Sequence, residues 1–259
     1  DRKKKIFVTT LLQALGYSKS DIVNEFYDKE NYSYDDKLKK WKTKFDPENY
    51  KAKNFSEEVI DAKTNKTVVK AGEKINFLTA KKLSNEGLKE IYVSNQSIYG
   101  KFLHKEVKIV EETVAIGAEL NETILDKLLE NNVYSIEISK TNSINKGPYI
   151  LQTLFNDKNE SKNDAITEIY KMLRPGEPPT LEIATQIFNN LFFSSDRYDL
   201  SDVGRVKMNS RLNLNCSDKI TILRNEDIVS IVKKMLDLRD GKDEVDDIDH
   251  LGNRRVRSV

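Results

Sequence analysis

The chain has 259 residues, of which 43 are basic and 42 are acidic, giving a formal net charge of +1. This balance excludes the uniformly basic surface that holds a whole domain on nucleic acid or on an anionic membrane. The apolar runs, such as residues 6–8 and 191–193, are too short to cross a bilayer, and the single cysteine, Cys216, excludes an intramolecular disulfide framework. We therefore expect a soluble, globular, cytoplasmic protein of one or two domains.

Both ends of the sequence are typical of a segment taken from a longer protein. The chain opens with Asp1 and a run of basic residues, without an initiator methionine or a signal peptide. It closes on an arginine-rich stretch that contains no helix-stop signal. A mature protein with trimmed termini is the alternative interpretation. We expect that the function of this chain belongs to a longer parent protein.

The first elements that the pattern predicts are two short helices. Residues 8–16 place three leucines on one face, with Gly16 in the position that commonly ends a helix. Ser20 then has the side chain of an N-cap, and the residues after it have the apolar spacing of a second helix.

A lysine-rich stretch follows the second predicted helix. Five of the eight residues from 37 to 44 are lysines, and they surround Trp41. A basic patch with an embedded aromatic can stack on a nucleic-acid base. More commonly such a patch is a solvated face whose aromatic side chain packs inward, and we favour this second interpretation.

Residues 59–139 contain an internal repeat with an offset of 45 residues. Residues 71–76 align with 116–121, and Ile91 aligns with Ile136. Each copy has the pattern of a strand, a glycine turn, a helix and a second strand with alternating apolar residues. Two copies are too few for a solenoid, so the pattern indicates a duplicated α/β module. Its lone histidine, His104, is expected to be a surface or structural residue, not a metal ligand.

The rest of the chain has mainly helical signals. They predict helices at residues 164–173, at 180–191 after a proline-rich break, and from about 225 to Gly241. We therefore predict an α+β fold, in which a mainly helical domain is interrupted by an inserted α/β module. The predicted domain comprises residues 1–27 and 146–259, and the predicted insertion comprises 28–145, with repeats at about 59–95 and 107–139.

The sequence contains none of the common catalytic motifs. It has no glycine-rich phosphate loop, no nucleophile elbow and no zinc-protease motif. Two histidines and one cysteine are too few for an ordinary structural zinc site, and the acidic stretch 240–250 lacks the spacing of a calcium loop. We expect no catalytic residue, metal or cofactor in this chain, which on its own has the character of a binding or scaffolding unit.

One dense polar group of residues remains near the end of the chain. Three aspartates at 246, 247 and 249 precede the arginines at 254, 255 and 257, and Arg174 lies in a proline-rich loop. Arginine guanidinium groups bind phosphates through two parallel hydrogen bonds, and aspartates accept hydrogen bonds from base amino groups. The alternative is an intramolecular Asp–Arg network that orients loops, and the spacing alone favours this alternative.

Several stretches of the chain closely resemble the β subunit of bacterial DNA-directed RNA polymerase. They are residues 174–180, 191–205 and 244–255, and residues 1–17 resemble an earlier stretch of that subunit. The middle of the chain, residues 28–145, is similar in position and length to the lineage-specific insertion of proteobacterial β subunits. The resemblance therefore covers both outer segments in detail and the middle more loosely.

The resemblance implies that the chain is the β lobe, a mixed α/β jaw of the cleft that grips DNA ahead of the active centre. In this family a pocket on the lobe receives a base of the non-template strand. The residues that match the pocket are Asp1, Arg174, Ile248, Asp249 and Arg254. Further phosphate contacts are expected from Arg255, Arg257 and Lys171. Lys171 stands where we expect arginine, which keeps the charge and loses the bidentate geometry.

The resemblance also implies the setting in which the chain works. The parent enzyme is a nucleotidyltransferase that transcribes DNA, and its catalytic Mg²⁺ is bound by another subunit, so the chain itself is expected to carry no cofactor. The expected partners are DNA, the β′, α and ω subunits and a sigma factor. The alternative is that the insertion, with Trp41 and the repeat, is a docking module for transcription regulators that has no direct role on DNA.

Overall fold

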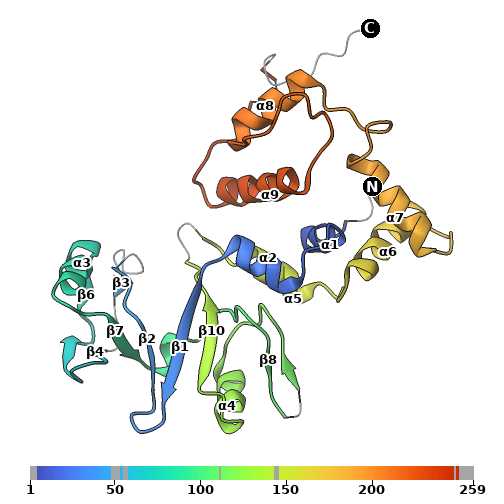
Figure 1. Cartoon of the computed structure of the whole chain (residues 1–259). Helices are drawn as coiled ribbons and strands as arrows, with labels where there is room; N and C mark the ends of the chain where they lie inside the picture. Colours follow the sequence, from blue (N-terminus) through green and yellow to red (C-terminus); the bar gives the residue numbers. More distant parts are fainter. Residues whose placement is uncertain are drawn as a thin grey trace. The chain divides into compact units, whose positions relative to one another are not determined.

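The computed structural model describes residues 5–47, 53–54, 58–110, 112–142, 146–247 and 249–250. These residues combine helices with antiparallel sheets (Figure 1), so the expected α+β fold class is confirmed. The chain separates into two compact units. The helical unit comprises Asp1–Ile22, Ser143–Tyr149 and Asp157–Val259, and the sheet unit comprises Val23–Asn142 and Ile150–Asn156. The sequence-based division at residues 28 and 145 stays a prediction.

Helices form most of the described structure of the helical unit. They are α1 (Val8–Ala14), α6 (Lys162–Leu173), α7 (Leu181–Phe192), α8 (Asp202–Leu212) and α9 (Asn225–Arg239). Helix α1 packs against α6, and α6 packs against α7. The helices that the sequence predicts at α1, α6, α7 and α9 are confirmed, whereas α8 was not predicted.

The second helix, α2 (Lys19–Phe26), begins before the residue predicted to cap it. The Oγ atom of Ser18 accepts a hydrogen bond from the Asp21 N–H group at 3.1 Å, and the Asp21 carboxylate accepts one from the Ser18 N–H group at 2.9 Å. This reciprocal pair is a capping box. The prediction that Ser20 caps the helix is wrong, because the helix begins at Lys19 and Ser20 lies within it, while Ser18 accepts the capping hydrogen bond.

Asp157 anchors α1 within the helical unit. Its buried carboxylate accepts hydrogen bonds from the side chains of Thr9, Thr10 and Gln13, at 2.6, 3.0 and 3.1 Å. It also accepts from the main chain and the side chain of Asn159. Burial alone would raise the pKa of Asp157, but these hydrogen bonds outweigh it and hold the pKa below its ordinary value.

The sheet unit is built on a six-stranded antiparallel sheet with the strand order β10-β1-β2-β7-β4-β5. Its strands are β1 (Lys29–Asp35), β2 (Lys40–Lys44), β4 (Val59–Asp61), β5 (Thr67–Val69), β7 (Glu90–Val93) and β10 (Ser135–Ser139). Two short pairs accompany it, namely β3 (Lys53–Asn54) with β6 (Lys74–Ile75) and β8 (Val107–Lys108) with β9 (Thr113–Val114). The helices of this part are α3 (Phe77–Asn85), the short η2 (Asn95–Ser97), α4 (Glu122–Glu130) and α5 (Tyr149–Asn156).

The sequence repeat corresponds to two similar pieces of structure. Helices α3 and α4 each begin after an asparagine, and the two asparagines lie 45 residues apart in the sequence. The Oδ1 atom of Asn76 accepts a hydrogen bond from the Thr79 N–H group at 2.8 Å, and that of Asn121 accepts one from the Ile124 N–H group at 2.9 Å. Each helix leads into a strand of the large sheet, β7 after α3 and β10 after α4. Each also contributes to an apolar cluster of its own among the described residues.

Trp41 belongs to the core, and the lysines beside it in the sequence do not. The Trp41 side chain is 0% exposed, and its indole N–H group donates to Oδ1 of Asn95 at 3.0 Å. Because strand residues alternate between faces, Lys40 and Lys42 lie on the opposite side of the sheet, where they pair with Glu58 and Glu90. The favoured interpretation of a solvated face with an inward-facing aromatic is confirmed.

His104 is a structural residue of the sheet unit and is not on its surface. Its ring is 4% exposed, with Nδ1 3.0 Å from the Ser139 hydroxyl and Nε2 2.9 Å from Oδ1 of Asn24. Burial lowers the pKa of His104, and the nearby carboxylate of Glu137 offsets part of this effect.

Among the helices of the described residues, none has both the length and the apolar composition needed to cross a lipid bilayer.

Candidate nucleic-acid interface

The arginine of the proline-rich loop is presented to solvent at the end of α6. The main-chain N–H group of Arg174 donates to the Tyr170 carbonyl at 2.8 Å, which fixes the backbone from which the side chain extends. Its Nη1 atom lies 3.4 Å from Oε1 of Glu177, and the Arg174 side chain is 54% exposed. An exposed ion pair of this kind contributes at most about 1 kcal/mol. A phosphate group can therefore replace Glu177 as the partner of Arg174.

Lys171 lies one helical turn before Arg174 and is also exposed. Lys171 lies in the last turn of α6, and Arg174 is the residue that ends this helix. They are the two predicted phosphate-binding residues that fall in the described part of the chain.

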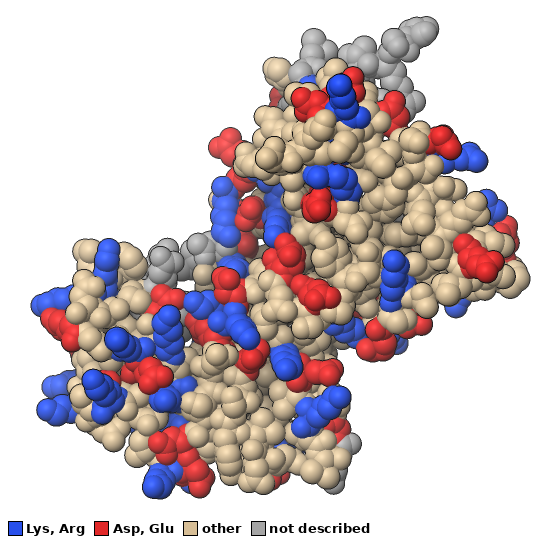
Figure 2. Space-filling model, in the orientation of Figure 1, with Lys and Arg blue, Asp and Glu red and all other residues tan. Residues whose placement is uncertain are grey.

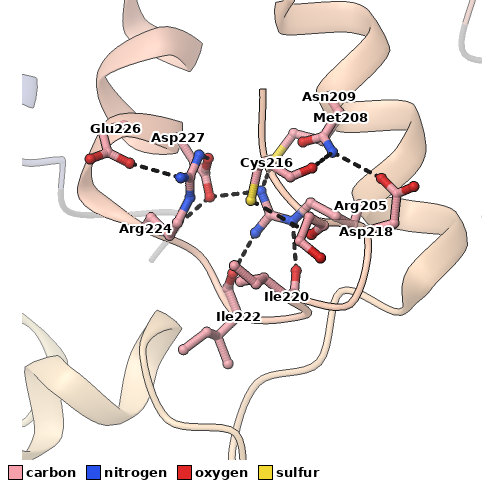
Figure 3. Close-up of polar contacts among 11 residues, drawn as sticks. Arg205, Met208, Asn209, Cys216, Asp218, Ile220, Ile222, Arg224, Glu226 and Asp227 are labelled. Carbon is pink, nitrogen blue, oxygen red and sulfur yellow. Dashed lines mark hydrogen bonds and ion pairs between the residues drawn. The ribbon is translucent and has the colours of Figure 1, made fainter. Parts of the chain in front are cut away.

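A buried ion pair joins α8 to α9 (Figure 3). The Nη1 atom of Arg205 donates to Oδ2 of Asp227 at 2.8 Å, and neither side chain is exposed to solvent. The remaining guanidinium nitrogens donate to the carbonyl oxygens of Ile220 and Ile222, which lie in the loop between the two helices. All three guanidinium nitrogens thus have acceptors, as a buried arginine requires.

Arg224 completes this network at the first turn of α9. It donates to Asp227 through its main-chain N–H group and through Nη2, both at 2.9 Å. Burial alone would raise the pKa of Asp227, but the hydrogen bonds from Arg224 and Arg205 outweigh it and hold the pKa below its ordinary value. The carboxylate stays charged, and the 213–224 loop is held between the two helices.

The acidic stretch after α9 is held by a second arginine of α8. Arg211 donates from Nε to Oδ2 of Asp246 at 3.0 Å, from Nη1 to Oδ2 of Asp243 at 3.1 Å, and from Nη2 to the carbonyl oxygen of Glu244 at 2.8 Å. Lys234 of α9 also pairs with Asp243. The expected Asp–Arg network that orients loops therefore exists for Asp246, and its arginine is one that the sequence analysis did not identify.

Asp249 lies just beyond this anchored stretch and is exposed. Its main-chain N–H group donates to Oδ1 of Asp247 at 2.9 Å. In the described part of the chain, the ion-pair partner of Arg174 is Glu177, and no hydrogen bond or ion pair joins Arg174 to Asp249. The other predicted site residues, Asp1, Ile248, Arg254, Arg255 and Arg257, lie outside the described residues.

The helical unit and residues 23–142 differ in the type of basic residue that they contain. All ten arginines of the chain lie outside residues 23–142, where every basic residue is a lysine. Figure 2 shows basic and acidic side chains interspersed over the face drawn, without a large field of one sign. Within the described residues, no group of three or more His, Cys, Asp or Glu side chains is arranged to hold a metal ion. Planar, bidentate recognition of phosphate is therefore available from the helical unit and not from residues 23–142.

Comparison with known proteins identifies the family. Residues 103–257 match the model of RNA polymerase Rpb2, domain 2. The DNA-directed RNA polymerase subunit beta of Rhizobium leguminosarum bv. trifolii (strain WSM2304) is 45% identical over 262 residues, and that of Rickettsia conorii (strain ATCC VR-613 / Malish 7) is 43% identical over 262 residues. Each match covers 100% of this chain and 19% of the relative, so the chain spans about a fifth of the length of these curated relatives.

The family model covers more than half of the chain, and the relatives match it along its whole length. The resemblance stated from the sequence is confirmed. The chain belongs to the RNA polymerase Rpb2, domain 2, family, as a segment of a β subunit of DNA-directed RNA polymerase.

Proposed function

We propose that this chain is the lobe of the β subunit that lines the DNA cleft and contacts downstream and non-template DNA during transcription. The observation that carries the proposal is the placement of Asp249. Its carboxylate is exposed at the end of a segment that Arg211 and Lys234 fix to two helices. An exposed acceptor that follows a held segment suits the recognition of a base edge in an open strand.

The chemistry of the site favours guanine among the four bases. A carboxylate is an acceptor only, and the Watson–Crick edge of an unpaired guanine offers neighbouring N–H donors. Arg174 and Lys171 are exposed cations of the same unit, and they supply contacts to the phosphates of the strand. Asp1, Ile248, Arg254, Arg255 and Arg257 complete the proposed pocket and its phosphate contacts in this assignment.

The proposal is tested by Asp249→Ala in the assembled polymerase. The lifetime of the open complex is measured on templates that differ only in the non-template base that enters the pocket. The ratio of the lifetime with guanine to that with thymine should fall by roughly fivefold or more, since a good base contact is worth about 1–3 kcal/mol. Asp196→Ala, which removes another exposed carboxylate of the helical unit, is the control and should keep the ratio. An unchanged ratio in Asp249→Ala would refute the assignment.

The parent enzyme supplies the chemistry in this proposal. Nucleotidyl transfer and its Mg²⁺ belong to another subunit, and this chain contributes no catalytic residue and no cofactor. Its proposed partners are DNA and the β′, α and ω subunits with a sigma factor, in the cytoplasm. Because the chain spans 19% of its relatives, these assignments rest on membership of the family.

Docking of transcription regulators on the sheet unit is the second candidate function. The described residues of the sheet unit form apolar clusters around α3 and α4, which favours a self-contained module. The aromatic rings of Tyr34 and Tyr134 stack with their centroids 6.0 Å apart, and Tyr134 is 41% exposed. Deletion of residues 28–145 from the polymerase should spare basal transcription and abolish the response to such a regulator. Loss of basal transcription would instead show that the insertion is needed for the structure of the lobe.

A further inference from the structure

The stretch that carries Asp249 has a composition that opposes a fixed structure. Six of the ten residues from 240 to 249 are acidic. Like charges at this density repel one another and favour an extended, mobile chain. In the described part of this stretch, Asp243, Glu244 and Asp246 are held by specific contacts, which offset the repulsion.

Arg211 supplies most of these contacts through one planar group. Its three guanidinium nitrogens donate to three separate acceptors of the stretch, the side chains of Asp243 and Asp246 and the main-chain carbonyl of Glu244, all within 3.1 Å. The Arg211 side chain is 33% exposed, and those of Asp243 and Asp246 are 26% and 56% exposed. A lysine has a single nitrogen and cannot reproduce this fork.

The helix that carries Arg211 is joined to α9 by a buried ion pair. Arg211 lies on α8, six residues after Arg205, whose buried pair with Asp227 fixes α8 to α9. Lys234 holds Asp243 from α9 itself, so both helices contact the acidic stretch. Asp249 follows three residues after Asp246, the last side chain that Arg211 holds, and its main-chain N–H group donates to Oδ1 of Asp247.

We infer that Arg211 is a positioning residue for base recognition, because it fixes the segment that presents Asp249 and does not contact DNA itself. The inference rests on the proposed function, in which Asp249 binds the non-template base. Each of the three guanidinium nitrogens of Arg211 already donates to an acceptor within the chain, so the group is directed toward the acidic stretch.

The test uses Arg211→Gln, Arg211→Lys and Asp246→Asn in the assembled polymerase, with the guanine-to-thymine lifetime ratio of the open complex as the readout. The two Arg211 variants break the fork, and Asp246→Asn weakens it by removing the charge of one acceptor. All three should lower the ratio, with Arg211→Gln approaching the roughly fivefold or greater loss expected of Asp249→Ala. Lys219→Gln, which removes one positive charge from an exposed position in the same unit, is the matched control and should keep the ratio.

Two further readouts separate positioning from a general structural role. Arg211→Gln combined with Asp249→Ala should be no worse than Asp249→Ala alone, because Arg211 acts through Asp249. The dependence of the lifetime on salt concentration should match that of the unmodified enzyme, because no phosphate contact is lost. The Asp246→Asn and Arg211→Lys variants keep the test decisive if Arg211→Gln fails to assemble.

Each outcome decides the inference. Three outcomes would overturn the positioning role of Arg211. The fork variants could all keep the ratio, the losses in the double variant could be additive, or the salt dependence could weaken. If Asp249→Ala itself leaves the ratio unchanged, the proposed function fails and takes this inference with it. That result is distinguishable from a failure of Arg211 alone, in which Asp249→Ala lowers the ratio and the fork variants do not.

Discussion

Arg205 and Asp227 form an ion pair 2.8 Å long in which neither side chain has any exposure to solvent. The cost of removing two charges from water is offset here by further hydrogen bonds, since Arg205 also donates to two main-chain carbonyls and Asp227 also accepts from Arg224. The pair therefore fixes the relation between α8 and α9. Arg211 of α8 and Lys234 of α9 both contact the acidic stretch after α9, so the pair also supports the two helices that hold this stretch.

We predict that Arg205→Met strongly destabilises the α8–α9 region. The substitution keeps much of the side-chain volume but removes the donor of the Ile220 and Ile222 carbonyls. Asp227 then keeps Arg224 as its remaining cation among the described residues. Loss of one partner of a buried pair costs about 3–5 kcal/mol. Hydrogen exchange of the α9 amide groups measures the local free energy of opening.

Arg197→Met is the control for this prediction, because Arg197 is an exposed arginine of the same unit. Its effect should stay within about 0.5 kcal/mol. Equal protection of α9 in the two variants would show that the buried pair contributes nothing to holding the helices together.

A second prediction concerns pH and the sheet unit. Burial lowers the pKa of His104 in the folded chain, whereas the unfolded chain has the ordinary histidine pKa of about 6.5. Below that pH the unfolded state takes up a proton that the folded state does not, so the free energy of unfolding falls as the pH decreases towards the lowered pKa. This contribution is fully present above about pH 6.5, and its slope cannot exceed about 1.4 kcal/mol per pH unit, the value for one proton.

Urea unfolding of the chain at a series of pH values from about 8 to about 5 tests this prediction, with tyrosine and tryptophan fluorescence as the signal. His104→Gln removes the titrating group and should flatten the curve in this range, while losing some stability at every pH. A curve of the same slope in the variant would assign the pH dependence to other groups.

The sequence predicted helices where apolar spacing was strong and failed where a charged residue occupied the buried position. Helix α6 buries Ala165, Ile166, Ile169 and Tyr170, which are four residues of one apolar stripe. In α8 the buried residue is Arg205, while Val203 and Val206 are exposed. A helix that buries an arginine through polar contacts has no apolar period to detect.

The candidate site was also predictable only in part, because some of its contacts join residues far apart in the sequence. Family resemblance identified Arg174 and Asp249, which the structure shows to be exposed. The role of Arg211 could not be predicted, because its acceptors lie more than 30 residues away in the sequence. Only the packing of α8 beside α9 brings Arg211 to Asp243 and Asp246. The local sequence around Arg211 carries no signal of these contacts, because they form only in the folded α8–α9 pair.

A third prediction separates phosphate contacts from base recognition in the proposed interface. Arg174→Ala should shorten the lifetime of the open complex by the same factor whichever base enters the pocket, because a phosphate contact carries no sequence information. The slope of the logarithm of the lifetime against the logarithm of the salt concentration should fall in magnitude by roughly one, the value expected for one lost contact.

Lys171→Arg should act in the opposite direction and lengthen the lifetime, since the added fork binds a phosphate through two hydrogen bonds. Arg197→Ala, at another exposed arginine of the helical unit, is the control and should change neither quantity. If Arg174→Ala altered the lifetimes in a base-dependent way, Arg174 would have to be assigned to base recognition together with Asp249, because loss of a phosphate contact alone weakens every sequence equally.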